Sequence, residues 1–189
     1  MEMEYSWTDG KKATSILKPR EKEEINKPGP YWMGPWAQLR VFFNGKLIKR
    51  PSQENSDYTD ANSLALLLRK TAPGLISFGF DRHLINWDDQ FPDGLGWSFT
   101  RKKGRVTFGL HIHSPSMIEI TEDEPFFTTT ITVAEFTQAM FSLYDRFVKE
   151  ILAINPRLAE HERFKPIIEA RDALSKRLKE LKQTRARDE

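Results

Sequence analysis

The chain has 189 residues, of which 39% are hydrophobic and 30% are charged, and its formal net charge is +2. This length and apolar content are sufficient for one domain of ordinary size with a hydrophobic core. Because the chain contains no cysteine, disulfides, thiolate nucleophiles and cysteine-ligated metal centres are excluded.

Charge is distributed unevenly along the chain. Residues 51–145 carry seven basic and thirteen acidic side chains, whereas residues 146–189 carry twelve basic and eight acidic ones. An acidic middle and a basic tail bear on the choice of partner rather than on the fold. The sequence has no run of about 18 apolar residues and no signal-peptide pattern, so we predict a cytoplasmic protein that does not engage a membrane.

The N-terminal third is predicted to contain a lead-in and a hairpin. Residues 1–30 hold few large apolar groups, Lys/Glu alternation and three prolines, so we expect an extended or partly disordered lead-in. A single domain is then expected over residues 31–183. Its first element is a hairpin in "WAQLRVFFNGKLI", because apolar residues alternate and Asn44-Gly45 suits a type I′ turn.

The region after the hairpin is predicted to form a helix, a strand and a long loop. Asp60 is placed to cap a leucine-rich helix over residues 61–72, which Pro73-Gly74 would end. The segment "LISFGF" reads as a strand. The acidic stretch that follows reads as a loop with a short strand over residues 84–87.

A second hairpin is predicted in "LGWSFTRKKGRVTFGLHIH". Its second arm alternates Val106, Phe108, Leu110 and Ile112 on one face, and Lys102-Lys103-Gly104 make the turn. The β-branched run "FFTTTIT" is expected to add a further strand.

At Thr132 the spacing of apolar residues changes from the alternation typical of a strand to the three- or four-residue spacing of a helix. Thr132 and Glu135 fit a capping box, and the apolar stripe that follows is Phe136, Met140, Leu143, Phe147 and Ile151.

A last helix is expected from Pro156 onward. Pro166 marks its real start or a kink, and Leu174, Leu178 and Leu181 continue its apolar seam. Residues 184–189 are expected to fray. Together these elements predict an α+β fold with a mainly antiparallel sheet of hairpins, helices packed on one face and a C-terminal helix pair.

Two histidines at alternate positions, His111 and His113, raise the question of chemistry. They share the strand face opposite the apolar stripe, and a metal site would need further ligands such as His83, His161, Asp81 or Glu119. No motif ties these residues together. We therefore expect exposed or half-buried imidazoles whose replacement is tolerated, and no cofactor.

Other catalytic patterns are weak in this sequence. The serines are interpreted as loop or cap residues without a GxSxG elbow, no phosphate-binding glycine loop is present, and adjacent carboxylates such as Asp88-Asp89 point apart. The sequence therefore predicts a protein without catalytic activity.

The remaining indication of function is a candidate recognition loop over residues 81–93. Acidic residues surround aromatic ones there, which is the composition of interface hot spots. The alternative interpretation is that the aromatic rings cover the sheet and the acids form a solvated rim. The candidate partner-binding residues are Trp87, Asp88, Asp89 and Asp93, with Glu122, Asp123 and Glu124 as a second acidic patch.

A family resemblance supports the binding interpretation. The segment from "GWSFTRKKGRVTFGLHIHSP" through "FFTTTITVAEFTQAMFSLYDRFVKEIL" resembles immunity proteins of bacterial polymorphic-toxin and contact-dependent growth inhibition systems. The resemblance covers roughly half of the chain and consists of a pattern of elements rather than a diagnostic motif. It implies a protein that binds one cognate toxin, a nuclease being one class, and performs no chemistry.

Two alternatives from other functional classes remain. The first is a nucleic-acid-associated protein that uses Lys46, Lys49, Arg50, the turn over residues 101–105 and the basic tail. We do not expect nucleic-acid binding, because the acidic middle offsets each basic cluster. The second is a metal-dependent hydrolase built around His111 and His113.

Overall fold

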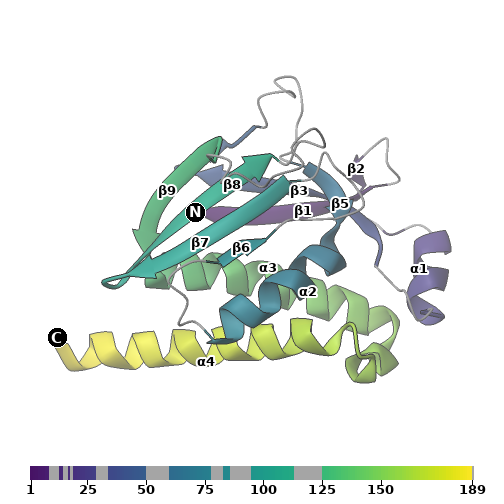
Figure 1. The fold of residues 1–189 in the computed structure, drawn as a ribbon. Coiled ribbons are helices and arrows are strands. Elements are labelled where there is room, and N and C mark those ends of the chain that lie inside the picture. Colours follow the sequence, from purple (N-terminus) through teal and green to yellow (C-terminus); the bar gives the residue numbers. More distant parts are fainter. Residues whose placement is uncertain are drawn as a thin grey trace.

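The chain folds into two antiparallel sheets and a layered set of helices, which confirms the predicted α+β class (Figure 1). Most of the apolar side chains that these elements bury belong to one hydrophobic core. This computed structural model describes residues 1–8, 13, 14, 17, 19–28, 34–49, 60–77, 83–85, 95–112 and 125–188.

The N-terminal sheet has the strand order β2-β1-β3-β4, and β5 also pairs with β3. The hairpin predicted in this region is confirmed, because Asn44 and Gly45 link β3 to β4 with positive φ angles of 50° and 74°. Both angles suit the type I′ turn. The strands are β1 (Glu2–Thr8), β2 (Ala13–Thr14), β3 (Trp36–Phe43), β4 (Lys46–Leu47) and β5 (Asp60–Ser63).

Strand β1 differs from the lead-in expected over residues 1–30. It lies between β2 and β3, and Met3, Tyr5 and Trp7 point into the core. The Tyr5 hydroxyl donates a hydrogen bond of 2.8 Å to Glu150 Oε2, and burial together with this carboxylate raises the pKa of Tyr5 above its ordinary value. The physical reason for the difference is alternation, since "MEMEYSW" places every second side chain on one face.

The second sheet has the order β6-β7-β8-β9. Its central hairpin and the Thr-rich strand are confirmed, and the β7–β8 turn consists of Lys103 and Gly104 at positive φ. The two sheets approach each other where the Phe43 and Phe127 ring centroids are 6.0 Å apart. The strands are β6 (His83–Ile85), β7 (Leu95–Lys102), β8 (Arg105–Ile112) and β9 (Phe127–Thr132).

Helix α2 (Leu64–Ser77) begins and ends later than predicted. Asp60 does not cap it, because this residue pairs with Leu39 in the sheet. The helix also continues through Pro73, so Leu75 is helical instead of part of the predicted strand. Burial explains the outcome, because most of the apolar side chains of α2, including Leu75 beyond the proline, enter the core, and this outweighs the cost of a proline near the end of the helix.

Helix α3 (Val133–Ile154) confirms the helix predicted after Thr132. Thr132 Oγ1 accepts a hydrogen bond from the Glu135 amide, and Glu135 Oε2 accepts one from the Thr132 amide, so the capping box is complete. All five members of the predicted apolar stripe are buried. The stripe faces the sheets, as expected for an amphipathic helix.

The remaining helices complete the layers. Helix α1 (Pro19–Asn26) lies at the end of the N-terminal sheet, and the 3₁₀ helix η2 (Pro156–Glu160) follows α3. Helix α4 (Lys165–Asp188) starts beside Pro166 as predicted, but it continues to Asp188 where fraying was expected. In Figure 1 the two sheets form the upper layer, α2 and α3 lie beneath them, and α4 covers α2 and α3 from below.

Candidate functional site

The candidate recognition loop lies outside the described residues. This holds for Trp87, Asp88, Asp89 and Asp93, and equally for the acidic patch Glu122, Asp123 and Glu124. Their role in binding therefore stays a prediction. The neighbouring Trp97, which flanks that loop in the sequence, is fully buried and donates a hydrogen bond of 2.9 Å to Thr71 Oγ1.

His111 is a buried residue with a bonded partner. It is only 7% exposed, and its Nε2 lies 2.7 Å from Ser98 Oγ on the adjacent strand. The expectation of an exposed or half-buried imidazole is therefore wrong for His111, and so is the expectation that Ser98 belongs to a loop or cap, since it lies within β7. Position 113 lies outside the described residues.

Gly109 explains how Ser98 and His111 can meet. In the β7–β8 ladder it stands opposite Ser98, on the same strand face as His111. A Cβ atom at this position would lie 2.8 Å from Ser98 Oγ and 3.2 Å from His111 Nε2. The pair therefore occupies the space that any larger residue would fill. The alternation of Gly109 and His111 is a sequence signal that could have identified the contact.

The described residues contain no group of three or more potential metal ligands. Of the further ligands considered for His111, His83 belongs to β6 and His161 follows η2, where its Nδ1 accepts a hydrogen bond from the Arg163 amide. Asp81 and Glu119 lie outside the described residues. Among the described residues, His83, His111 and His161 therefore lie on separate elements.

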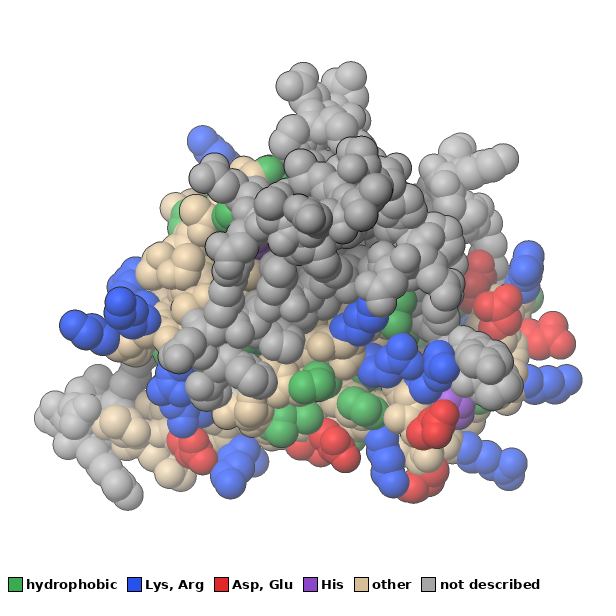
Figure 2. Space-filling model, viewed as in Figure 1, with side chains coloured by type: hydrophobic (Ala, Val, Ile, Leu, Met, Phe, Trp, Pro, Cys, Tyr) green, Lys and Arg blue, Asp and Glu red, His purple; other side chains and the backbone are tan. Residues whose placement is uncertain are grey.

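A basic hairpin tip, defined here as residues 101–105, is the most strongly charged turn that the structure describes. All five of its residues are exposed. The tip is held in place at its base, because the Gly104 carbonyl accepts a hydrogen bond of 3.2 Å from the Val133 amide at the start of α3. Figure 2 shows Lys and Arg side chains projecting at the end of the molecule where this hairpin turns. The basic residues are Arg101, Lys102, Lys103 and Arg105.

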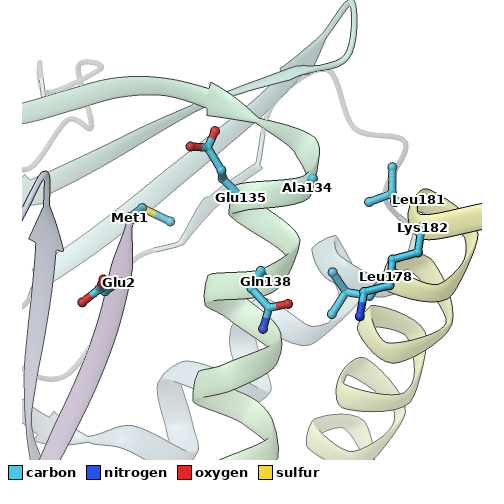
Figure 3. Close-up of a pocket in the computed structure, with 8 residues that line it drawn as sticks. All are labelled: Met1, Glu2, Ala134, Glu135, Gln138, Leu178, Leu181 and Lys182. Carbon is cyan, nitrogen blue, oxygen red and sulfur yellow. The ribbon is translucent and has the colours of Figure 1, made fainter. Parts of the chain in front are cut away.

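Next to the tip lies a pocket of about 440 Å³ between the start of β1, the start of α3 and the C-terminal part of α4. In Figure 3 the side chains of Leu178 and Leu181 extend from α4 toward α3, and Lys182 reaches back over the same space. This volume falls within the roughly 300–1,000 Å³ of typical ligand pockets. The residues that line it are Met1, Glu2, Ala134, Glu135, Gln138, Leu178, Leu181 and Lys182.

The capping box lowers the pKa of Glu135, one of the carboxylates that line the pocket. Hydrogen bonds from the Thr132 amide and hydroxyl hold the pKa of Glu135 below its ordinary value, and the nearby Arg105 lowers it further. Glu135 is therefore ionised at neutral pH, with its charge already matched by the cap and by the hairpin tip. Glu135 thus lines the pocket and also interacts electrostatically with Arg105 of the basic hairpin.

Sequence reasoning did not find this pocket, although one signal was present. The apolar seam of α4 extends past Leu174, which is fully buried, to Leu178 and Leu181, which are half-buried. The facing turns of α3 offer Ala134 and Gln138, which are too small or too polar to cover two leucines. An apolar seam that continues past the apolar residues of the facing helix indicates a surface that is not completely covered.

Comparisons with known proteins do not assign the chain to a family. No family model, curated protein or solved structure matches it. Among the described residues, no helix combines the length and the apolar character needed to cross a bilayer.

Proposed function

We propose that this chain is a cytoplasmic, protein-binding inhibitor without catalytic activity, of the kind that neutralises a cognate bacterial toxin. The observation that carries the proposal is the pocket beside the basic hairpin tip. An apolar floor with a charged rim is the usual anatomy of a protein–protein interface. The lining side chains are apolar, amide or charged groups, and none of them carries a hydroxyl or an imidazole.

The segment that resembles immunity proteins also supports the proposal. Its hairpin (β7 and β8), its Thr-rich strand (β9) and its helix (α3) are consecutive in the chain and packed together in the fold. The Val133–Gly104 hydrogen bond and the capping box join these elements into one frame. A rigid frame limits the entropy lost on binding, which favours tight inhibition.

Co-expression tests the proposal directly. The chain is expressed together with the product of its neighbouring open reading frame, and growth is scored with and without it. We expect the intact chain to restore growth and to co-purify with the toxin in equal amounts. If growth is not restored and the two proteins do not co-purify, the proposed function is wrong. His111→Ala serves as a control for catalysis, and it should still protect when expressed at a temperature that keeps it folded.

A hydrolase is the second candidate, because Ser98 Oγ and His111 Nε2 are within hydrogen-bonding distance. A serine nucleophile next to a histidine base is the basic arrangement of acyl-transfer enzymes. A hydrolytic histidine must also reach substrate, however, and His111 is 7% exposed. We therefore expect no covalent labelling of Ser98 by a fluorophosphonate probe. Stoichiometric labelling that is lost in Ser98→Ala would favour the hydrolase.

The nucleic-acid alternative has less support from the described surface. The hairpin tip is basic, but two of the arginines of α4 are paired with acids, in the 2.7 Å Arg171–Asp172 pair and the 3.2 Å Arg177–Glu180 pair. Nucleic-acid binders concentrate positive charge on one face. We expect weak, strongly salt-dependent binding to DNA and RNA.

A further inference from the structure

The pocket has an aliphatic floor. Leu178 and Leu181 are half-buried on α4, and Ala134 completes the wall on α3. Burial of such aliphatic surface by a partner is favourable because it removes apolar area from water. The floor of the pocket therefore favours an apolar side chain over a phosphate or a sugar.

Charged side chains lie around the pocket. Lys182 lies at one side and the basic hairpin tip at the other, and Arg105 is near enough to Glu135 to lower its pKa. Figure 3 shows that the carboxylates of Glu2 and Glu135 both point away from α4. Lys182 and the hairpin tip thus place cations near Leu178 and Leu181, on the sides from which the two carboxylates point away, and these cations complement negative charge on a partner.

The lining of the pocket favours a protein segment over a nucleic acid. Single-stranded nucleic acids are usually held by aromatic side chains that stack on the bases. The lining residues of this pocket include no aromatic side chain. A protein segment fits the pocket and the hairpin tip together, since an aliphatic residue can enter the pocket while neighbouring carboxylates contact the cations of the tip.

We propose that the pocket and the hairpin tip together dock an acidic protein segment that inserts one or two aliphatic side chains between α3 and α4. The inference rests on the proposed function for its premise that the chain binds a protein, and it adds the chemistry of the partner. This surface is opposite in charge to the predicted acidic loop, so the two would engage different parts of a partner.

A fluorescein-labelled peptide, Asp-Glu-Leu-Asp-Leu-Glu-Asp, tests the inference by anisotropy titration of the full chain. We expect a micromolar Kd, weakened by salt and lost when serines replace the leucines of the peptide. Lys102→Glu with Lys103→Glu should raise the Kd at least about fivefold through the reversed rim charge. Leu181→Gln should weaken binding as well, with circular dichroism as a check on folding.

The matched control is Arg20→Glu with Lys22→Glu, which makes the same change in net charge on exposed residues of α1. It should leave the Kd within about twofold, because screening removes distant charge effects. The inference is overturned by any of three results: equal weakening by both double variants, equal binding of the serine peptide, or tip-dependent binding of a single-stranded oligonucleotide more tightly than the peptide.

The growth assay separates this inference from the proposed function. Failure of the intact chain to protect cells would refute the function, whatever the peptide does. Full protection by the Lys102→Glu/Lys103→Glu variant, combined with no peptide binding by the intact chain, would refute only the docking surface. Loss of protection in that variant, with protection by the α1 control, supports both.

Discussion

Two buried threonines illustrate how single residues hold this core together. Thr71 and Thr137 both donate to the carbonyl four residues earlier in their own helix, with distances of 2.8 Å and 2.6 Å. Only Thr71 has a second role, because it accepts the indole hydrogen of Trp97 and thereby links α2 to β7. Buried donors that lose their acceptor are costly, whereas a local helix contact is cheap to lose.

Thr71→Val is therefore expected to destabilise the protein by about 1–3 kcal/mol. At about 2–4 °C per kcal/mol for a chain of this size, the melting temperature should fall accordingly. Thr137→Val is the matched control and should change the unfolding free energy by less than about 0.5 kcal/mol. Urea denaturation of both variants measures this difference. Equal losses would show that the Trp97 hydrogen bond contributes nothing.

Gly109→Ala tests the contact between Ser98 and His111. The added methyl group would lie 2.8 Å from Ser98 Oγ, so the serine must rotate away and lose the histidine. We expect a loss of roughly 1 kcal/mol, the usual worth of one such hydrogen bond plus local strain. In a Ser98→Ala background the same substitution should cost clearly less. Additive losses in the double-mutant cycle would contradict a shared contact.

At the scale of elements, the capping box is the best-defined connection between a strand and a helix. Thr132→Ala removes the side-chain half of the box and should cost about 1 kcal/mol. Because Glu135 has a lowered pKa in the folded protein, its contribution is fully present above its ordinary value of 4.5. It is lost as the pH falls through the lower folded-state pKa.

Glu135→Gln isolates this pH dependence. Its stability should be below that of the intact chain at pH 7 and should converge with it as the pH falls from 4.5 through the lower folded-state pKa of Glu135. The difference is expected to be smaller than that for Thr132→Ala, because Glu135 is exposed and solvent screens its charge. Thermal unfolding across this pH range measures it. A gap that stays constant down to pH 3 would show that the charge of Glu135 plays no part.

Local signals made some elements predictable and left others hidden. The two hairpins and α3 carried turn residues, alternation or a capping box, and these patterns act within a few residues. The ends of helix α2 differ from those that its proline and its possible cap predict, because burial against the sheets and α4 determines where it begins and ends. Strand β1 was missed because its lysine- and glutamate-rich neighbours obscured the alternation within "MEMEYSW". Long-range packing overrides local propensity at such places.

The candidate site was less predictable than the fold. The basic hairpin was identified as a charged turn, but its position beside α3 depends on the Val133–Gly104 hydrogen bond between distant segments. The pocket depends in the same way on where α4 crosses α3. Such juxtapositions arise from tertiary packing and carry little signal in sequence order.

For the whole molecule, the acidic loop remains a separate prediction about how a partner approaches. Asp88→Lys with Asp89→Lys should slow association with a basic toxin without unfolding the domain, because rim charges steer encounter. Trp87→Ala should raise the dissociation rate, with a cost of about 2 kcal/mol or more if the ring is an interface anchor. Surface plasmon resonance measures both rates. An unchanged association rate for the reversed variant would exclude this loop from the encounter surface.

Hydrogen exchange of the chain, free and in complex with its co-purified toxin, tests the central claim most directly. If the protein is an inhibitor that docks its partner through the pocket and hairpin tip, amides over residues 101–105, 133–138 and 178–184 should exchange more slowly in the complex. Exchange in α1 should stay the same, because this helix lies away from the proposed surface. A stable complex with unchanged exchange in all three segments would contradict the account.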